Sequence, residues 1–411
     1  MTGSNEMNRA LAARYLPFAV LLFGLTLSPV MPELSSVGFF SLAAVGLFLI
    51  MRRHELRIAF KSPAVLLPLV AGALILLALL ITTRGPSNLV PVVLFMPLLL
   101  IAPVAAVLGS GRKITADHIA LFALVGSFAA MALALIDSRL LGIGRAGQSV
   151  NNPIHFAAVS VVIGFIALTG LYAGNRFVRM AALLGPLFGL VAAALSGSRG
   201  PLLAFPVMLV VALLVLLFQR VNGRQAWVIT AGLVLLGVGT LIWMWQSPLV
   251  SSVPGIGDVI LYLRDGAVRD SSSGERAAMY QGGLRALMDS PWFGHGANFV
   301  GAAAELSADP ATFPRYEHLH SDLLDFGALA GALGLAAYAL FIAAAPVSAC
   351  RIVEPKNRGM AQLVAFPVAA GYLVLGLTNA TIGVIAQTIV LAVVCALVTY
   401  LSPAQASKAT P

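Results

Sequence analysis

The chain has 411 residues, of which 59% are hydrophobic and 10% are charged, and its formal net charge is +9. A soluble domain usually carries about 25% charged residues, so the composition excludes an ordinary soluble protein and indicates an integral membrane protein. The basic residues lie in short segments between apolar runs, and no soluble basic domain is present that could bind nucleic acid.

About twelve apolar runs are long enough to cross a membrane as helices, which need about 20 residues each. The runs are continuous rather than alternating, which favours helices over a β-barrel. They cover approximately residues 15–31, 35–51, 63–82, 88–108, 115–137, 153–174, 178–196, 200–219, 226–246, 321–345, 360–379 and 382–402. The sequence therefore predicts an all-α integral membrane protein of about 12 transmembrane helices.

The basic residues predict the orientation of these helices, because lysine and arginine concentrate in short cytoplasmic loops. If the N-terminus is cytoplasmic, the opposite face receives in its short loops only Arg84, Arg139, Arg145 and Arg199. We therefore expect both termini to be cytoplasmic and the first span to be retained. The predicted organisation is transmembrane helices 1–9 over residues 1–246, a periplasmic loop over 247–320, helices 10–12 over 321–402, and a cytoplasmic tail over 403–411.

One long hydrophilic segment, roughly residues 246–321, interrupts this apolar chain. It contains eight of the 16 acidic residues and five arginines: Arg264, Arg269, Arg276, Arg285 and Arg315. A membrane protein that concentrates its polar residues in one extramembrane loop is expected to carry out its chemistry there.

The first polar motif in chain order precedes the sixth run. Asn152 and Pro153 form a turn and helix-start signal. Arg145, earlier in the same outer loop, is a candidate cation facing the outer cavity. His155, just inside the run, is interpreted as a packing residue.

The second motif is the segment 196–201, Ser-Gly-Ser-Arg-Gly-Pro, which joins two runs too closely for a real loop. Pro201 suits the first turn of a helix, and Ser196 or Ser198 can cap it. The segment predicts a fixed cation, Arg199, beside a helix N-terminus, whose N–H groups and dipole favour anions. A phosphate-bearing ligand fits this arrangement, and so does an arginine that reaches toward lipid headgroups.

The third motif surrounds Arg276 in the long hydrophilic segment. Ser272 and Glu275 have the spacing of a capping box, and apolar residues then recur at roughly helical spacing. We predict an amphipathic helix from Glu275 to Ser290 that rests on the outer face of the membrane domain, with Arg276 in its first turn. An ordinary solvated arginine is the alternative.

The fourth motif, His318 to Asp325, precedes and opens the tenth run. A histidine at the mouth of a helical bundle can act as a general base, because its usual pKa of about 6.5 leaves it mostly neutral at pH 7. Asp322 and Asp325 share one helical face and could orient an imidazole or hold a sugar hydroxyl. A zinc site made by His318, His320 and these carboxylates is a weaker alternative, since no third clear ligand is present. Histidines that anchor the membrane interface are a further alternative.

Taken in this order, the motifs resemble the O-antigen ligase and polymerase superfamily of bacterial inner-membrane glycan transferases. The resemblance covers most of residues 140–340, whereas the first spans match only in hydropathy. It rests on Arg145 with Asn152-Pro153, Ser-Gly-Ser-Arg-Gly at 196–200, Gly274-Glu275-Arg276 before Pro291-x-x-Gly294-x-Gly296, and His320-Ser321 with Leu323-Leu324, Gly327, Gly331 and Gly334.

The resemblance implies a GT-C-like fold and a glycan donor linked to undecaprenyl pyrophosphate, used at the periplasmic face. For a ligase, the acceptor is a sugar of the lipid A-core oligosaccharide. Family roles map the donor pyrophosphate onto Arg199 and Arg276, with Arg145 as a third cation, and the catalytic base onto His320. The supporting residues are His318, Ser321, Asp322, Asp325, Ser198 and Asn152. Ser321 departs from the family, in which asparagine usually follows the histidine, and His318 adds a second histidine.

The residues are compatible with this chemistry without a metal or another cofactor. Fixed guanidinium groups bind phosphate oxygens bidentately and can stabilise a departing pyrophosphate as a divalent cation does elsewhere. A histidine that accepts the proton of the attacking hydroxyl gives in-line attack with inversion.

Three alternative functions stay open. A polysaccharide polymerase would have the same fold and donor but a lipid-linked glycan as acceptor. A protein-glycosylating relative would commonly carry a sizeable extra C-terminal region. A lipid-linked oligosaccharide transporter belongs to another class, and should show charged residues near mid-membrane or discontinuous helices.

Overall fold

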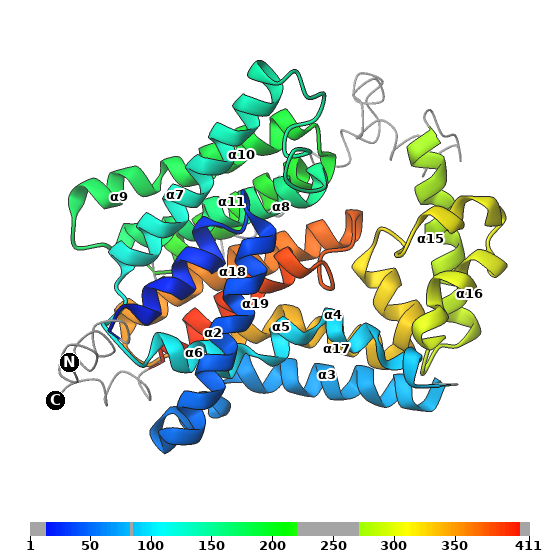
Figure 1. Cartoon of the computed structure of the whole chain (residues 1–411), viewed down its shortest axis with the longest axis horizontal. Coiled ribbons are helices and arrows are strands. Elements are labelled where there is room, and N and C mark those ends of the chain that lie inside the picture. Colours follow the sequence, from blue (N-terminus) through cyan, green and yellow to red (C-terminus); the bar gives the residue numbers. More distant parts are fainter. Residues whose placement is uncertain (1–13, 83–84, 220–270, 403–411) are drawn as a thin grey trace, which may run out of the picture.

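The computed structural model describes residues 14–82, 85–219 and 271–402, and every regular element in these ranges is a helix. Figure 1 shows a bundle of long helices with α15 (Ser271–Asp289) crossing one end of it. Eight of the described helices are long and apolar enough to cross a membrane, and two shorter apolar helices, Arg14–Thr26 and Ile385–Tyr400, accompany them. The prediction of an all-α, multi-pass membrane protein is therefore confirmed. The ninth predicted run, 226–246, lies outside the described residues.

The elements of the first half begin with the helix Arg14–Thr26, whose last turn is η1 (Leu22–Thr26). The elements that follow are α2 (Pro32–Arg52), η2 (His54–Lys61), α3 (Pro63–Thr82), η3 (Pro86–Leu89), α4 (Pro91–Leu94), α5 (Met96–Leu99), α6 (Ile101–Leu108), α7 (Ala116–Leu135), η4 (Ile136–Leu140), α8 (Pro153–Ile166), η5 (Ala167–Tyr172), α9 (Arg176–Ala182), α10 (Leu184–Ser196) and α11 (Arg199–Phe218). After α15, the second half contains η6 (Gly296–Asn298), α16 (Phe299–Leu306), η7 (Pro310–Arg315), α17 (Asp322–Cys350), α18 (Pro355–Thr378) and α19 (Ile385–Tyr400).

The run predicted at residues 88–108 is not one helix. It is divided among η3, α4, α5 and α6. Pro91, Pro97 and Pro103 explain the division, because a proline inside a helix removes a hydrogen bond and its ring collides with the preceding turn. The run was predicted from its apolar composition, which does not show that these prolines divide it.

The bundle is organised around α8 and α19, which are surrounded by other helices. In the span that contains α8, 83% of the most apolar window is buried within the protein, against 22% in α11. Residues along the whole of α19 are buried as well. The exposed leucines and valines of the peripheral helices therefore form the surface that faces lipid.

The first described helix begins at the end of the bundle where the last helix, α19, ends. The backbone N–H of Arg112 donates to the carbonyl of Arg14 (2.9 Å), and the Tyr400 hydroxyl accepts from the backbone N–H of Ile114 (3.0 Å). Figure 1 shows α15 at the opposite end. We call that opposite end, which carries α15, the site end.

α17 is broken by a kink at Gly331. This residue has φ 60° and ψ −140°, a conformation that only glycine adopts readily. A Cβ on Gly334 would lie 1.9 Å from the carbonyl oxygen of Phe326, so the segments before and after Gly331 fold against each other. The predicted run 321–345 therefore consists of two helical segments.

The turn that follows α15 fills the break in α17. The backbone N–H of Ala332 donates to the carbonyl of Pro291 (2.7 Å), and that of His295 donates to the carbonyl of Ala328 (2.8 Å). These bonds satisfy backbone groups that the broken helix leaves without helical partners. α15 and both segments of α17 are thereby joined into one frame.

Replacing Gly331 with alanine is expected to destabilise the protein strongly. A Cβ at this position would lie 2.5 to 2.7 Å from backbone atoms of Trp292, Phe293 and Pro291, which cannot move independently. Gly327→Ala is the matched control, since its Cβ would meet only the ends of two flexible side chains, Leu287 at 3.3 Å and Leu335 at 3.6 Å. Thermal unfolding of the purified proteins should show a lower Tm for Gly331→Ala and little change for Gly327→Ala. Equal Tm values for the two variants would contradict this interpretation of the break.

Candidate active site

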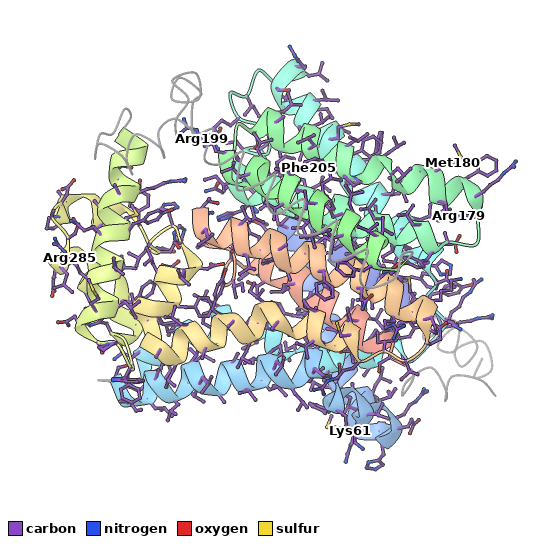
Figure 2. All side chains as sticks on the ribbon, turned by 180° about the vertical axis from the view of Figure 1, so that it is seen from behind. Lys61, Arg179, Met180, Arg199, Phe205 and Arg285 are labelled. Atoms are coloured by element: carbon purple, nitrogen blue, oxygen red, sulfur yellow. The ribbon has the colours of Figure 1, made fainter. Side chains whose placement is uncertain are left out.

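The polar residues of the site end converge on the end of α18 and the loop after it, residues 378–383. A Cβ on Gly200, in the first turn of α11, would lie 2.4 Å from the Thr378 hydroxyl oxygen. Arg276 Nη1 donates to the Thr378 carbonyl at 3.2 Å. The start of α11, which carries Arg199, and the guanidinium of Arg276 therefore meet at the same residue. Figure 2 shows Arg199 at the site end, whereas Arg179 and Lys61 lie toward the other end.

His320 reaches the same loop. Its Nδ1 lies 2.7 Å from the side-chain oxygen of Asn379. The amide nitrogen of Asn379 donates to the carbonyl of Ala380 (3.3 Å), so the amide oxygen faces the imidazole. An amide oxygen only accepts, which requires that Nδ1 of His320 carry the proton. The lone pair of the neutral ring is therefore on Nε2.

The backbone of His320 has a positive φ of 53°. Among the described residues, His320 is the only non-glycine residue with a positive φ. Such a conformation costs about 1 to 3 kcal/mol and is found preferentially at functional sites. The Tyr280 hydroxyl lies 3.2 Å from the carbonyl oxygens of both His320 and Leu377. Burial raises the pKa of Tyr280, so the phenol stays protonated and can donate. Tyr280 thus connects α15 to the strained residue.

His318 lies against His320, and the neutral rings of the two residues carry their protons on different nitrogen atoms. Its Nδ1 accepts the backbone N–H of His320 at 3.3 Å, and the two ring centroids are 4.4 Å apart in an edge-to-face contact. Since Nδ1 accepts, the neutral His318 ring carries its proton on Nε2. Tyr316 covers another side of His320, at 5.1 Å between centroids.

Both imidazoles are held in the neutral form. Burial is the main cause that lowers the pKa of His320 to about 4, with His318 and Arg276 adding to the effect and the Asn379 hydrogen bond and Glu275 opposing it. Burial also lowers the pKa of His318 to about 4, followed by the neighbouring His155. His155, interpreted from the sequence as a packing residue, is thus part of this histidine cluster.

Asp322 and Asp325 do not contact the ring of His320 in any hydrogen bond that the structure contains. The Asp322 carboxylate accepts the backbone N–H groups of Thr381 (2.7 Å) and Ile382 (3.3 Å) and the Thr381 hydroxyl. Asp325 Oδ1 accepts the backbone N–H of Leu319 at 2.7 Å. The two carboxylates therefore hold the two loops that carry Asn379 and His320, and orient the imidazole only through the backbone.

The starts of α8 and α11 lie side by side at the site end and are held there by Arg145, Ser198 and Asn152. Arg145 donates from Nε to the Ser196 carbonyl (3.0 Å) and from Nη2 to the Ser198 hydroxyl (3.1 Å). Ser198, one of the two serines predicted to cap α11, is at its N-cap position, but its hydroxyl donates to the Pro153 carbonyl (3.2 Å) and no side chain caps the helix, so the predicted cap is wrong. The Asn152 side chain caps α8 by accepting from the backbone N–H of Ile154 (2.9 Å), which confirms the predicted helix start.

The predicted amphipathic helix is α15, which already includes Ser271. The proposed capping residue Ser272 therefore lies inside the helix, and Arg276 lies in its second turn and not in its first. Among the residues that the structure describes, no group of three or more His, Cys, Asp and Glu side chains is arranged to hold a metal ion.

The sequence did not point to Asn379, Thr381, Tyr280 or His155 as site residues. One signal was available for the first two, because Asn379-Ala380-Thr381 places polar side chains between two apolar runs. Tyr280 and His155 have no such signal, since packing explains an aromatic residue on the amphipathic helix α15 and a single histidine on the apolar helix α8.

The family described as O-antigen ligase matches residues 184–339 of the chain. The match includes the start of α11 with Arg199, α15 with Arg276, and the segment from His318 to Asp325. No curated protein matches the chain. The match covers less than half of the chain; together with the membrane-spanning bundle, it supports the O-antigen ligase and polymerase superfamily for this multi-pass membrane protein.

Proposed function

We propose that the protein is an O-antigen ligase, which transfers a glycan from undecaprenyl pyrophosphate to a sugar of lipid A-core at the periplasmic face of the bacterial inner membrane. The observation that carries the proposal is the convergence of Arg276, the start of α11 and His320 on residues 378–379. The cationic groups and the neutral imidazole thereby contact two adjacent residues, Thr378 and Asn379. Glycan transfer needs both, because the leaving group is an anion and the nucleophile is a hydroxyl that must lose its proton.

In this mechanism His320 is the general base. Its Nε2 accepts the proton of the acceptor hydroxyl while the hydroxyl oxygen forms a bond to the anomeric carbon of the donor. The bond from that carbon to the pyrophosphate oxygen breaks on the opposite side, so the configuration inverts. The bond from Nδ1 to Asn379 supports this role because it directs the lone pair to Nε2.

Arg276 and Arg199 stabilise the departing pyrophosphate. Guanidinium groups keep their charge at all physiological pH values and pair with phosphate oxygens through two parallel N–H bonds. Arg276 uses Nη1 to bind the Thr378 carbonyl, which orients the guanidinium toward the loop. Arg145 holds the turn 196–198 through two hydrogen bonds, so we assign it mainly to positioning the residue that follows, Arg199.

Glycan transfer is expected to survive removal of divalent metals, because the arginines supply the positive charge. The test combines the purified protein with lipid-linked glycan and rough lipopolysaccharide, with and without chelator, and detects a laddered lipopolysaccharide product. Loss of activity in EDTA that one divalent ion restores would contradict the arginine mechanism.

The same assay separates ligase from polymerase. With lipid-linked glycan as the only substrate, a ligase makes no product, whereas a polymerase lengthens the lipid-linked chain. No transfer to either acceptor, together with donor movement across vesicles, would instead support a transporter.

Asn379→Asp is expected to move the acid limb of the pH profile upward. A carboxylate beside Nδ1 stabilises the imidazolium, so it raises the pKa of His320 from about 4, and activity is lost at a higher pH. Asn379→Leu should instead lower kcat, because the ring loses the bond that selects its tautomer. The measurement is kcat/KM against pH, with Asn357→Leu, at the opposite end of the bundle, as the control. An unchanged profile in Asn379→Asp would show that Asn379 does not act through His320.

A further inference from the structure

α15 presents two different surfaces. One side is buried and carries small residues that allow close contact; a Cβ on Gly282, for example, would lie 2.3 Å from the carbonyl oxygen of Ala303. The other side exposes Leu284 (49%) and Met288 (62%), which are one helical turn apart. Large apolar side chains at this exposure are not explained by packing within the protein.

The turn after α15 extends this apolar surface. Trp292 is 70% exposed and Phe293 is 38% exposed. Their backbone is fixed in the break of α17 at Gly331, so their position is set by the fold. We call the exposed surface of Leu284, Met288, Trp292 and Phe293 the α15 patch.

The position of the α15 patch along the bundle follows from the residues beside it. A Cβ on Gly296 would lie 2.6 Å from the hydroxyl oxygen of Thr82, the last residue of α3. Because α3 is an apolar span, Thr82 marks the depth at which the hydrocarbon region of the membrane ends. The turn that carries Trp292 therefore lies beside the end of an apolar span.

The α15 patch continues a surface that already faces lipid. The last turns of α3 expose Leu77 (48%), Leu80 (53%) and Ile81 (52%). On α15, Leu287 packs on α17 beside Gly327, next to the exposed leucine and methionine. Arg285 lies on the same exposed face, next to Met288 but farther around the helix from Leu287. It binds the Leu306 carbonyl and projects away from the bundle (Figure 2), so the exposed face has an apolar flank beside α17 and a polar flank turned away from it.

We infer that the α15 patch inserts into the boundary between headgroups and acyl chains of the membrane at the site end. An apolar flank beside a lipid-facing span, a polar flank turned away from the bundle, and a tryptophan beside the end of an apolar span are the features of an interfacial helix. The inserted patch ties α15, and with it Arg276 and Tyr280, to the membrane surface. This inference does not depend on the reaction that the site catalyses.

Fluorescence of Trp292 tests the inference directly. The chain has four tryptophans, so replacing Trp227, Trp243 and Trp245 with phenylalanine leaves Trp292 as the single fluorophore. The protein is reconstituted in phosphatidylcholine bilayers with bromine on the acyl chains close to the headgroup. We expect strong quenching by these lipids and weak quenching by iodide in the water phase.

A matched control places the fluorophore on the polar flank. Arg285→Trp combined with Trp292→Phe in the same background should show strong quenching by iodide and weak quenching by brominated lipid. If the triple replacement does not fold, the difference in quenching between the unmodified protein and Trp292→Phe reports the same residue.

Two results would overturn the inference. Strong iodide quenching of Trp292 without quenching by brominated lipid would place the patch in water. Shielding from both quenchers that increases with the protein-to-lipid ratio would show that a second copy of the chain covers the patch.

Discussion

Replacing His320 with alanine is expected to abolish glycan transfer, while expression and folding stay near normal. A positioned general base increases the rate by about 10²- to 10⁴-fold. Among the described residues, no second imidazole beside Asn379 has its lone pair on Nε2. His318 carries its proton on Nε2 and cannot accept there, so His318→Ala should cause a smaller loss. Single-turnover transfer with saturating donor measures both effects. Full activity of His320→Ala, or the reverse ranking of the two variants, would falsify the assignment.

The pH dependence of the unmodified protein gives an independent test of His320. The base acts in its neutral form, and its pKa of about 4 means that kcat/KM should stay constant down to about pH 5 and fall below it. Arg276 is one cause of the low pKa. A bound pyrophosphate offsets that positive charge, so the acid limb of kcat, which reports the donor complex, should lie at higher pH than that of kcat/KM. Coinciding limbs near pH 6.5 would indicate a solvated histidine.

Arg276→Lys is expected to lower kcat/KM for the donor by about 10²- to 10³-fold, the effect of removing one positioned transition-state donor. Lysine retains the charge but lacks the planar fork, and it cannot bind the Thr378 carbonyl and a phosphate in the same geometry. Arg199→Lys should show a loss of the same kind. Donor titration at saturating acceptor measures the effect.

Arg285→Lys is the matched control for this substitution. Arg285 lies on the same helix and also binds a backbone carbonyl, that of Leu306 at 2.8 Å, but it is exposed and projects away from the bundle. It should retain nearly full activity. Full activity of both Arg276→Lys and Arg199→Lys would mean that these arginines anchor the structure or lipid and do not bind the donor.

Local sequence patterns were sufficient to predict several elements of the protein. Long apolar runs predict membrane helices because backbone groups in lipid must be paired within the segment, and eight such helices are present among the described residues. Asn152 with Pro153 predicted the start of α8, and Ser198 the start of α11. Each of these features depends on residues close together in the chain.

Other local patterns predicted the element but not its form. The run 88–108 was apolar throughout, yet its prolines divide it. The run 321–345 was continuous in composition, yet it is kinked at Gly331, because the turn at 291–296 supplies the hydrogen-bond partners that make a break inside an apolar segment possible. Hydropathy does not contain this information, since Pro291 precedes Ala332 by 41 residues and His295 precedes Ala328 by 33.

The sequence by itself determined the membrane class, most of the helices, and the arginines and histidines that are candidates for chemistry. Only the tertiary structure decided how they are combined. Helix packing brings α11, α15 and the segment before α17 to one loop, where Asn379 selects the tautomer of His320 and Thr378 contacts both arginine-bearing helices. The physical reason is that a hydrogen bond or a close contact depends on distance in space, and these partners are 59 to more than 100 residues apart in the chain.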